Sequence, residues 1–329
     1  MKVVHFHRKR RHNANFSIEG FYANVRNELK DKINIEYVEL PFLSNGVLRR
    51  LYNLIYAAFK QGDVNHVTGD VNYLNMFFNK NKTIVTILDC GLLDRTNGFT
   101  HEIYKYFWFT LPVQKAKYIV AISEATKTEI LKYVKCDPDK IKVIHVSVSP
   151  LFNRVDKDFN KEKPIILQIG AAPNKNLSRL IESVKDLSCK LIIVGKLKED
   201  KIKLLNDYKI EYENFVDITQ EELYEQYKRC DMLFFASTYE GFGMPIVEAN
   251  IIGRPVLTSN LYSMPEVAGD SALLVDPYNT EAIRNGIVKI INDADYRNEL
   301  ISKGFKNAEK FTLEKMTNNY LSIYKLFLR

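Results

Sequence analysis

Short runs of apolar residues alternate with longer amphipathic segments along the whole chain. In the first half these runs are MKVVHF, INIEYVEL, VNHVT, TIVTIL, YIVAI and KVIHV; in the second half they are PIILQIG, KLIIVG, DMLFFAS, PVLTS and ALLVD. Short runs rich in Val, Ile and Leu predict strands that are buried on both faces, and the segments between them predict helices. Residues 123–134, for example, begin at Ser123, a favourable helix N-cap. The pattern therefore predicts an α/β protein with parallel sheets.

A polar stretch, SPLFNRVDKDFNKEK, separates the two series of strands. A chain of 329 residues is also longer than one ordinary core requires. We therefore predict two doubly wound domains, residues 1–150 and 164–311, joined by a linker at 151–163. The last segment, 312–329, is amphipathic and has no strand after it, and we predict that it packs back on the first domain.

Composition and charge narrow the class of protein. The content of 46% hydrophobic and 26% charged residues is typical of a globular protein, and no apolar run approaches the length of a membrane span. The N-terminus does not resemble a signal peptide, and the four scattered cysteines lack metal-site spacing, so we expect a cytoplasmic protein. Residues 1–155 hold 23 Lys and Arg against 14 Asp and Glu, whereas the remainder holds 24 against 26. The basic first half predicts an anionic partner.

The stretch ASTYEGFGMPIVEAN, residues 236–250, carries the most informative chemistry. It follows a predicted strand, so its glycine turn lies at the carboxyl edge of the sheet, where ligands of parallel sheets bind. Pro245 marks the first turn of the next helix, whose free N–H groups favour a diphosphate. Glu240 and Glu248 can accept hydrogen bonds from sugar hydroxyls. A simpler interpretation is that both glutamates are solvated surface charges. The glycine turn, Pro245 and the preceding strand favour a nucleotide-sugar site instead.

These residues resemble the donor-binding half of the retaining glycosyltransferases of family 4, which have the GT-B fold. ILQIGAAPNKNLSRLIES, SPLF and VAISEAT match further parts of the family, and the resemblance is strongest over residues 164–277. It implies two Rossmann-like domains that face each other across a cleft. It also implies a hexosyl transfer with retention, with a nucleotide-diphosphate sugar as co-substrate and with neither a metal nor another cofactor.

The resemblance also implies roles for individual residues. Glu240 serves the donor sugar, Glu248 the ribose, and Lys175 the diphosphate. Glu240, Lys175 and Asp89 are the candidate catalytic residues. The remaining candidate donor-binding residues are Asn174, Asn176, Gly241, Phe242, Gly243, Met244 and Pro245.

Two positions depart from the family pattern. Ala171 stands where many members have an arginine or similar donor, and Leu88-Asp89 stands where many have His-Asp. Asn174 and backbone amides are then expected to support Lys175 at the diphosphate. The departures keep open the alternative of a transfer-inactive GT-B protein that binds a nucleotide sugar or a partner. A nucleotide-sugar epimerase of the same fold is a further alternative, although the spacing of Glu240 and Glu248 with GFGMP fits the transferases better.

The acceptor side is expected in the first domain. HFHRKRRH follows the first strand, and its basic residues Arg8, Lys9, Arg10 and Arg11 are candidates for holding an anionic, lipid-linked glycan in cell-surface glycan assembly, or for touching the inner membrane face. A solvated basic loop is the alternative. The aromatic run at 104–112 is interpreted as a core helix rather than a membrane-facing patch. We expect no nucleic-acid partner, because no recognised binding module is visible.

Overall fold

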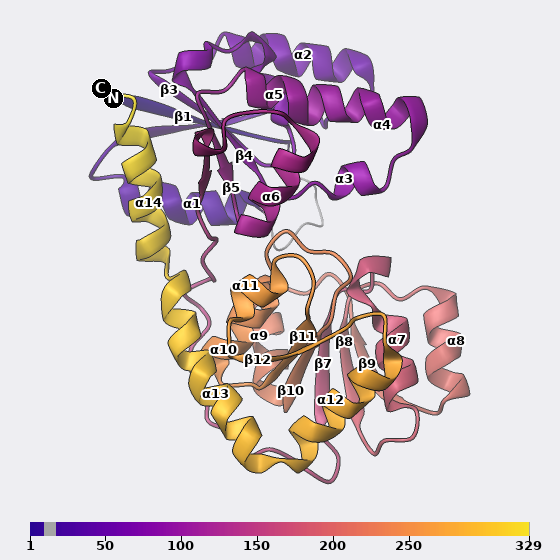
Figure 1. Ribbon diagram of the computed structural model, residues 1–329. Coiled ribbons are helices and arrows are strands. Elements are labelled where there is room, and N and C mark those ends of the chain that lie inside the picture. The colour runs from indigo at the N-terminus through magenta and orange to yellow at the C-terminus, as the bar shows by residue number, and fades with distance from the viewer. Residues whose placement is uncertain (10–17, 329) are drawn as a thin grey trace. The chain divides into compact units, whose positions relative to one another are not determined.

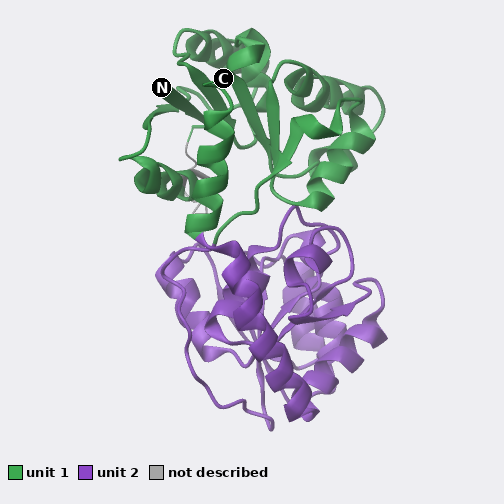
Figure 2. Ribbon diagram, turned by 60° about the vertical axis from the view of Figure 1, so that its left-hand side comes forward, with its two compact units in different colours: residues 1–147, 313–329 green, residues 148–312 purple. Residues whose placement is uncertain are grey.

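The computed structural model describes residues 1–9 and 18–328. The chain forms two compact units, which Figure 2 shows in two colours: Met1–Ser147 with Leu313–Arg329, and Val148–Thr312. The boundary at 147/148 lies a few residues before the predicted linker, and residues 151–163 belong to unit 2. The C-terminal segment belongs to unit 1 although the chain reaches it only after completing unit 2.

Unit 1 contains a parallel sheet of six strands in the order β2-β1-β3-β4-β5-β6 (Figure 1). The strands are β1 (Lys2–His7), β2 (Asn34–Glu39), β3 (Val64–Thr68), β4 (Thr83–Ile87), β5 (Tyr118–Ala121) and β6 (Ile141–Val143). Each of the six apolar runs of the first half became one of these strands. β3 and β4 are buried along their whole length, which explains their continuous apolar and β-branched sequences.

Helices cover both faces of this sheet. α1 (Ile18–Leu29) and the C-terminal α14 (Leu313–Lys325) pack on one face, where Tyr22, Val25, Tyr320 and Tyr324 form a core with strand residues. A second core on the other face includes residues of α2 (Val47–Ala58), η1 (Asn72–Phe77), α3 (Gly91–Asp94), α4 (Gly98–Tyr104), η3 (Lys105–Thr110), α5 (Leu111–Gln114) and α6 (Glu124–Tyr133). The short 3-10 turns η2 (Lys80–Lys82) and η4 (Pro138–Lys140) contain no buried residue. Ser123 caps α6 by accepting a hydrogen bond from the Thr126 N–H at 3.0 Å, as its sequence predicts.

The aromatic run divides between core and surface. It forms the π-helical turn η3 and its neighbours, where Phe109 is buried and Trp108 packs against the core. Tyr106 and Phe107 keep 49% and 38% of their surface exposed. The interpretation as a core helix is therefore correct for only part of the run.

Unit 2 contains a second parallel sheet of six strands in the order β12-β11-β10-β7-β8-β9. The strands are β7 (Ile165–Ile169), β8 (Lys190–Val194), β9 (Glu211–Phe215), β10 (Met232–Phe235), β11 (Val256–Ser259) and β12 (Ala272–Val275). Its helices are η5 (Pro173–Lys175), α7 (Leu177–Val184), α8 (Glu199–Asp207), α9 (Gln220–Arg229), α10 (Met244–Ile252), α11 (Met264–Ala268), α12 (Thr280–Asn292), α13 (Ala294–Ala308) and η6 (Glu309–Phe311).

Five strands of unit 2 are those expected from apolar runs, and β9 is the addition. Its sequence, EYENF, lacks an apolar run because β9 is an edge strand and is largely accessible. Its Glu213 instead pairs with Arg229, with a nitrogen–oxygen distance of 2.7 Å. Hydrophobic patterning detects strands that are buried on both faces and misses a polar edge strand of this kind.

Candidate active site

The donor-binding candidates of unit 2 lie on two loops that follow neighbouring strands. β7 and β10 pair in the sheet, so the loop 170–176 and the loop 236–243 emerge side by side. The Thr238 N–H donates to the Asn174 carbonyl at 2.8 Å, and the Asn174 amide donates to the Tyr239 carbonyl at 3.0 Å. These two hydrogen bonds hold the loops together at the carboxyl edge of the sheet.

Lys175 and Glu240 meet across these loops. The Lys175 Nζ lies 2.6 Å from Glu240 Oε1, and both side chains are mostly buried. The aliphatic part of Lys175 runs over Gly170, where an added Cβ would lie only 2.7 Å from the lysine Cγ. Gly170 has a φ of +88°, so glycine is required there by conformation and by space. The result is a lysine ammonium held beside the glycine turn and balanced by one carboxylate.

The glycine turn leads directly into α10. Gly243 is the N-cap residue with a φ of +112°, and Pro245 occupies the first turn, as its sequence predicts. Phe242 is buried and stacks edge-on against Phe311 at 5.5 Å. The Ser263 hydroxyl lies within hydrogen-bond distance of the Glu240 and Phe242 carbonyls, at 2.9 and 2.7 Å. Ser263 thus fixes the turn, a role that no local sequence signal indicates.

Glu248 lies one turn into α10 and is 6% exposed. The Tyr227 hydroxyl donates to its Oε2 at 2.7 Å. Burial raises the pKa of Glu248 to about 7, although the Tyr227 hydrogen bond and the Lys175 charge both lower it. Glu248 therefore changes its charge close to neutral pH, which the sequence does not reveal.

Asn176 differs from the other donor-binding candidates because its side chain is occupied by protein contacts. It adopts a left-handed conformation, and its amide donates to the Ala236 carbonyl at 2.9 Å and to the Pro277 carbonyl at 2.7 Å. Its Oδ1 accepts from Arg179 at 2.9 Å. Asn176 thus links its own loop to the segments at Ala236 and Pro277. A substitution at Asn176 would affect ligand binding indirectly, by changing the positions of these loops.

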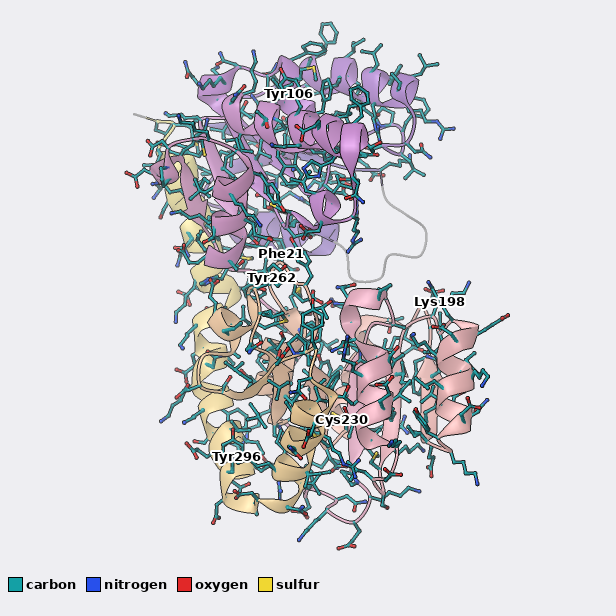
Figure 3. All side chains as sticks on the ribbon, turned by 45° about the vertical axis from the view of Figure 1, so that its right-hand side comes forward. Phe21, Tyr106, Lys198, Cys230, Tyr262 and Tyr296 are labelled. Carbon is teal, nitrogen blue, oxygen red and sulfur yellow. The ribbon has the colours of Figure 1, made fainter. Side chains whose placement is uncertain are left out.

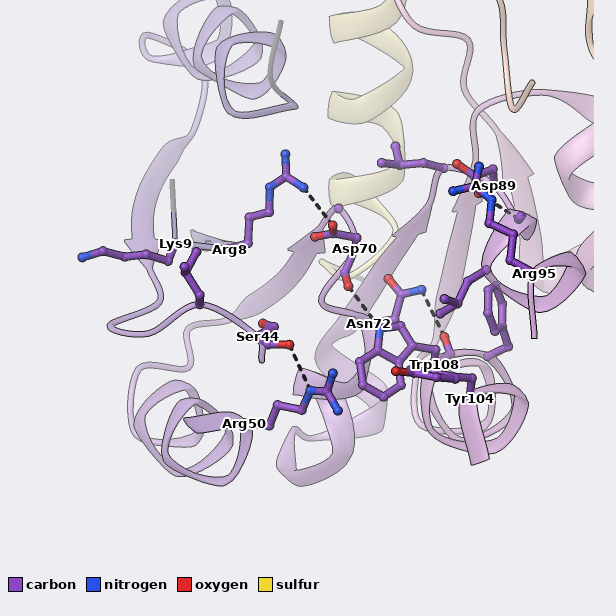
Figure 4. A pocket seen from close by; sticks show the side chains of 16 residues that line it. Arg8, Lys9, Ser44, Arg50, Asp70, Asn72, Asp89, Arg95, Tyr104 and Trp108 are labelled. Carbon is purple, nitrogen blue, oxygen red and sulfur yellow. Dashed lines mark hydrogen bonds and ion pairs between the residues drawn. The ribbon is translucent and has the colours of Figure 1, made fainter. Parts of the chain in front are cut away.

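A pocket of about 380 Å³ lies in unit 1 at the carboxyl ends of β1, β3 and β4 (Figure 4). The sequence-predicted Arg8, Lys9 and Asp89 all line it, whereas Arg10 and Arg11 lie outside the described residues. Four cationic side chains face two carboxylates in its lining: Arg8, Lys9, Arg50 and Arg95 against Asp70 and Asp89. The pocket is thus suited to an anionic group.

The charged residues of the pocket are fixed by contacts within unit 1. Arg8 pairs with Asp70 at 2.8 Å, and the Asp89 Oδ1 accepts from the Gly91 N–H at 2.9 Å. The Arg50 guanidinium stacks over Trp108 with 4.7 Å to the ring centre and donates from Nε to the Ser44 carbonyl at 3.1 Å. Asp70 follows the carboxyl end of the strand VNHVT, where ligands of parallel sheets bind, so the sequence could have identified it. Arg50, Arg95 and Trp108 come from helical segments and carry no comparable signal.

Neither a metal cluster nor a membrane-spanning helix occurs in the part of the chain that the structure describes. No group of three or more His, Cys, Asp or Glu residues there could hold an ion. No helix among residues 1–9 and 18–328 is long and apolar enough to cross a bilayer.

The two doubly wound units define the class of protein, a GT-B fold, and the predicted fold class is confirmed. Residues 151–307 match the family model described as Glycosyl transferases group 1. The crystal structure of Anabaena HepE in complex with UDP and glucose superposes with a TM-score of 0.78 at 16% identity, and covers 99% of each chain.

Two relatives act in O-antigen synthesis according to their names. The chain is 28% identical over 239 residues to the O-antigen chain mannosyltransferase B of Escherichia coli. This match covers 65% of this chain and 62% of that protein. It is 27% identical over 266 residues to the O-antigen chain mannosyltransferase RfbU of Salmonella typhimurium, and this match covers 74% of this chain and 70% of that protein. The first match thus spans less than two thirds of the relative.

Proposed function

We propose that this chain is a glycosyltransferase that moves a hexose from a nucleotide-diphosphate sugar to a hydroxyl of a growing cell-surface glycan. One observation carries the proposal: Lys175, Glu240 and Glu248 gather at the carboxyl edge of β7 and β10, beside the N-terminus of α10. This edge offers positive charge and amide donors for phosphates, and carboxylates for hydroxyls. The O-antigen mannosyltransferase relatives support a glycan acceptor.

The proposed reaction is a substitution on one face of the donor sugar. The bond between the sugar C1 and the diphosphate oxygen breaks, and a bond from C1 to the acceptor oxygen forms on the same face. The acceptor proton passes to the departing diphosphate. Lys175 and the α10 N-terminus stabilise the negative charge that the diphosphate gains, which is the work a divalent metal does in other transferases. Glu240 orients the sugar, and Glu248 binds the ribose.

We assign the acceptor to the pocket of unit 1 and expect it to be an anionic, lipid-linked glycan at the cytoplasmic membrane face. Four cationic and two acidic side chains line this pocket, which gives it an excess of positive charge. One of the two acidic residues, Asp89, is a candidate for orienting the acceptor hydroxyl. Arg50 and Arg95 join the predicted Arg8 and Lys9 as phosphate-binding candidates. Replacing Arg95 with Gln should raise the Michaelis constant for the acceptor and leave donor affinity unchanged.

A donor screen followed by a transfer assay tests the proposal. Thermal unfolding is measured with UDP-, GDP- and ADP-sugars, because a donor at about 100 times its dissociation constant adds roughly 2.7 kcal/mol. Transfer by the selected donor is then followed with EDTA present, and NMR reports the anomeric configuration of the product. Binding without transfer would support the inactive binder, and sugar interconversion without an acceptor would support the epimerase. No response to any donor would contradict the proposal.

A further inference from the structure

The outward face of α2 is apolar, although a helix on the surface of a sheet usually turns polar residues outward. Asn53, Leu54 and Ala57 of α2 are buried against unit 1. The opposite face holds the exposed apolar residues Val47, Leu48, Leu51, Tyr52 and Ile55, with Phe59 just after the helix. Leu48 and Phe59 keep 81% and 85% of their surface accessible. α2 is thus apolar on the face that packs on the protein and on the face that does not.

This apolar face continues into neighbouring segments. Phe42 and Leu43 precede α2 and are also exposed, and the Phe42 ring packs edge-on against Tyr52 at 5.1 Å. On the same side of the sheet, Phe99 of α4 is 81% exposed and Tyr106 of η3 is 49% exposed. Figure 3 shows Tyr106 near the end of unit 1 where Figure 1 places α2. The contact between Phe42 and Tyr52 extends the exposed apolar surface beyond α2, and exposed apolar surface of this kind marks a docking site.

The charged residues within the segments that form this face are all basic. No Asp or Glu occurs from Leu40 to Gly62, whereas Arg49, Arg50 and Lys60 lie within that stretch. The segment 71–88, which includes η1 against α2, also contains no acidic residue and carries Lys80 and Lys82. The face formed by Phe42, Leu43 and α2 therefore exposes Leu, Phe and Tyr beside Lys and Arg, whereas the exposed Glu102 lies on α4, between Phe99 and Tyr106 in the sequence. An apolar face with basic neighbours is complementary to an anionic lipid bilayer.

We propose that the face formed by Phe42, Leu43 and α2 docks on the surface of an anionic phospholipid membrane. Leu43, Ser44 and Arg50 also line the pocket of unit 1, so the docking face borders the proposed acceptor site. A lipid-linked acceptor then reaches the pocket along the membrane surface. The inference deepens the proposed membrane setting and rests on it for its biological role. The docking itself is measured without any transfer reaction.

Vesicle sedimentation tests the docking face directly. Full-length protein is mixed with vesicles of phosphatidylglycerol and phosphatidylcholine, or of phosphatidylcholine alone. We expect binding to the anionic vesicles only, and weakening as salt screens the charges. The variant Leu48→Ser/Phe59→Ser should need at least about tenfold more lipid for half-maximal binding, because two large exposed side chains no longer enter the bilayer.

Two further variants control the experiment. Leu328→Ser/Tyr278→Ser removes exposed apolar side chains that do not belong to the segment 42–59. These side chains are 66% and 58% accessible, and the variant should bind like the wild type. Arg49→Gln/Lys60→Gln should weaken binding roughly fivefold for each lost charge, and it leaves Arg50 of the pocket intact. Thermal unfolding confirms that each variant is folded.

Three outcomes would overturn the inference. The wild type could ignore anionic vesicles, or the Leu48→Ser/Phe59→Ser variant could bind them like the wild type. Alternatively, sedimentation velocity could show a wild-type dimer that the same variant converts to a monomer, which would assign the face to a second copy of the chain. Transfer to a soluble acceptor is measured separately, so a failed docking test and a failed transferase assignment are distinguishable.

Discussion

At the scale of single residues, Glu248 makes donor binding depend on pH. Its pKa of about 7 means that the carboxyl is largely protonated at pH 6 and ionised at pH 8. The ionised form is an acceptor at both oxygens and carries a charge, whereas the protonated form turns one oxygen into an O–H donor, so affinity for a nucleotide sugar should rise up to about tenfold across this range. The diphosphate diester of a nucleotide sugar does not titrate near neutrality, so calorimetric titration isolates the protein group. A flat profile would remove Glu248 from the binding site.

Tyr227 sets the position of that pH dependence. It is fully buried and donates to Glu248 Oε2 at 2.7 Å. Replacing Tyr227 with Phe removes a hydrogen bond that favours the ionised carboxylate, so the rise in affinity should move to higher pH. Tyr224→Phe on the same helix is the matched control and should keep the wild-type profile. An unchanged pH profile in the Tyr227 variant would limit that residue to packing.

Lys175 and Glu240 are coupled by their ion pair. A diphosphate that takes the Lys175 ammonium must share it with Glu240, whose carboxylate lies 2.6 Å away. Lys175→Met should weaken binding of a nucleoside diphosphate by about 1.5–3 kcal/mol and leave the nucleoside unaffected. Glu240→Gln should bind the diphosphate at least as tightly as the wild type while transfer slows. Isothermal titration with nucleoside and diphosphate separates the two effects; weaker diphosphate binding by Glu240→Gln would contradict this coupling.

At the scale of elements, α14 is joined to the unit 1 sheet by a buried cluster of tyrosines and histidines. The Tyr324 hydroxyl lies 2.8 Å from both His5 Nε2 and His66 Nδ1, and the Tyr22 hydroxyl donates to Thr86 at 2.8 Å. Tyr324→Phe leaves both ring nitrogens without this partner and should cost about 1–3 kcal/mol of unfolding free energy. Urea denaturation measures the loss, with the exposed Tyr106→Phe as control. An effect equal to that of the control would show that packing alone holds α14.

The same cluster makes unit 1 sensitive to acid. Burial lowers the pKa of His66 from 6.5 to about 3, and burial also lowers the pKa of His5. The unfolded chain therefore binds protons that the folded unit does not, so stability is lost as pH falls below 6.5. His66 alone should contribute about 2 kcal/mol of destabilisation at pH 5. All six histidines precede residue 148, so unit 2 contains none of them. In unit 2 the raised pKa of Glu248 means that the folded state binds the extra proton, so this group stabilises unit 2 as pH falls. Calorimetry at pH 7.5 and 5 should therefore show the unfolding temperature of unit 1 falling and that of unit 2 rising.

The sequence predicts elements better than it predicts contacts between them. Apolar runs identified eleven of the strands, including the edge strand β2, which has no buried residue but retains Ile35, Tyr37 and Val38. The edge strand β9 was missed because its sequence, EYENF, is more polar. Because ligands of parallel sheets bind at the carboxyl ends of the strands, the sequence could place Lys175, Glu240 and Asp89 near binding sites. It could not foresee Ser263 or Tyr227, because these act through contacts between segments that are distant along the chain. Ala171 and Leu88, which depart from the family pattern, lie on these same edges.

At the scale of the whole molecule, the two units differ in how the chain builds them. Unit 2 is one continuous segment, Val148–Thr312, whereas unit 1 requires the C-terminal segment from Leu313. Met316, Tyr320, Ile323 and Tyr324 of α14 are buried in the unit 1 core. A fragment 1–147 would expose the apolar surface that α14 covers, and should aggregate or remain partly unfolded. A fragment 148–312 retains its complete core.

We therefore expect the fragment 148–312 to fold alone and to bind the donor. It contains Lys175, Glu240 and Glu248 together with Tyr227 and Ser263, which hold them in place. Donor at about 100 times its dissociation constant should raise its unfolding free energy by roughly 2.7 kcal/mol, as it does for unit 2 in the full chain. The control is the same fragment carrying Lys175→Met, which should fold normally and respond less. A folded fragment 148–312 that fails to bind a donor bound by the full chain would show that unit 1 supplies essential donor contacts, and would overturn the assignment of the donor site to unit 2 alone.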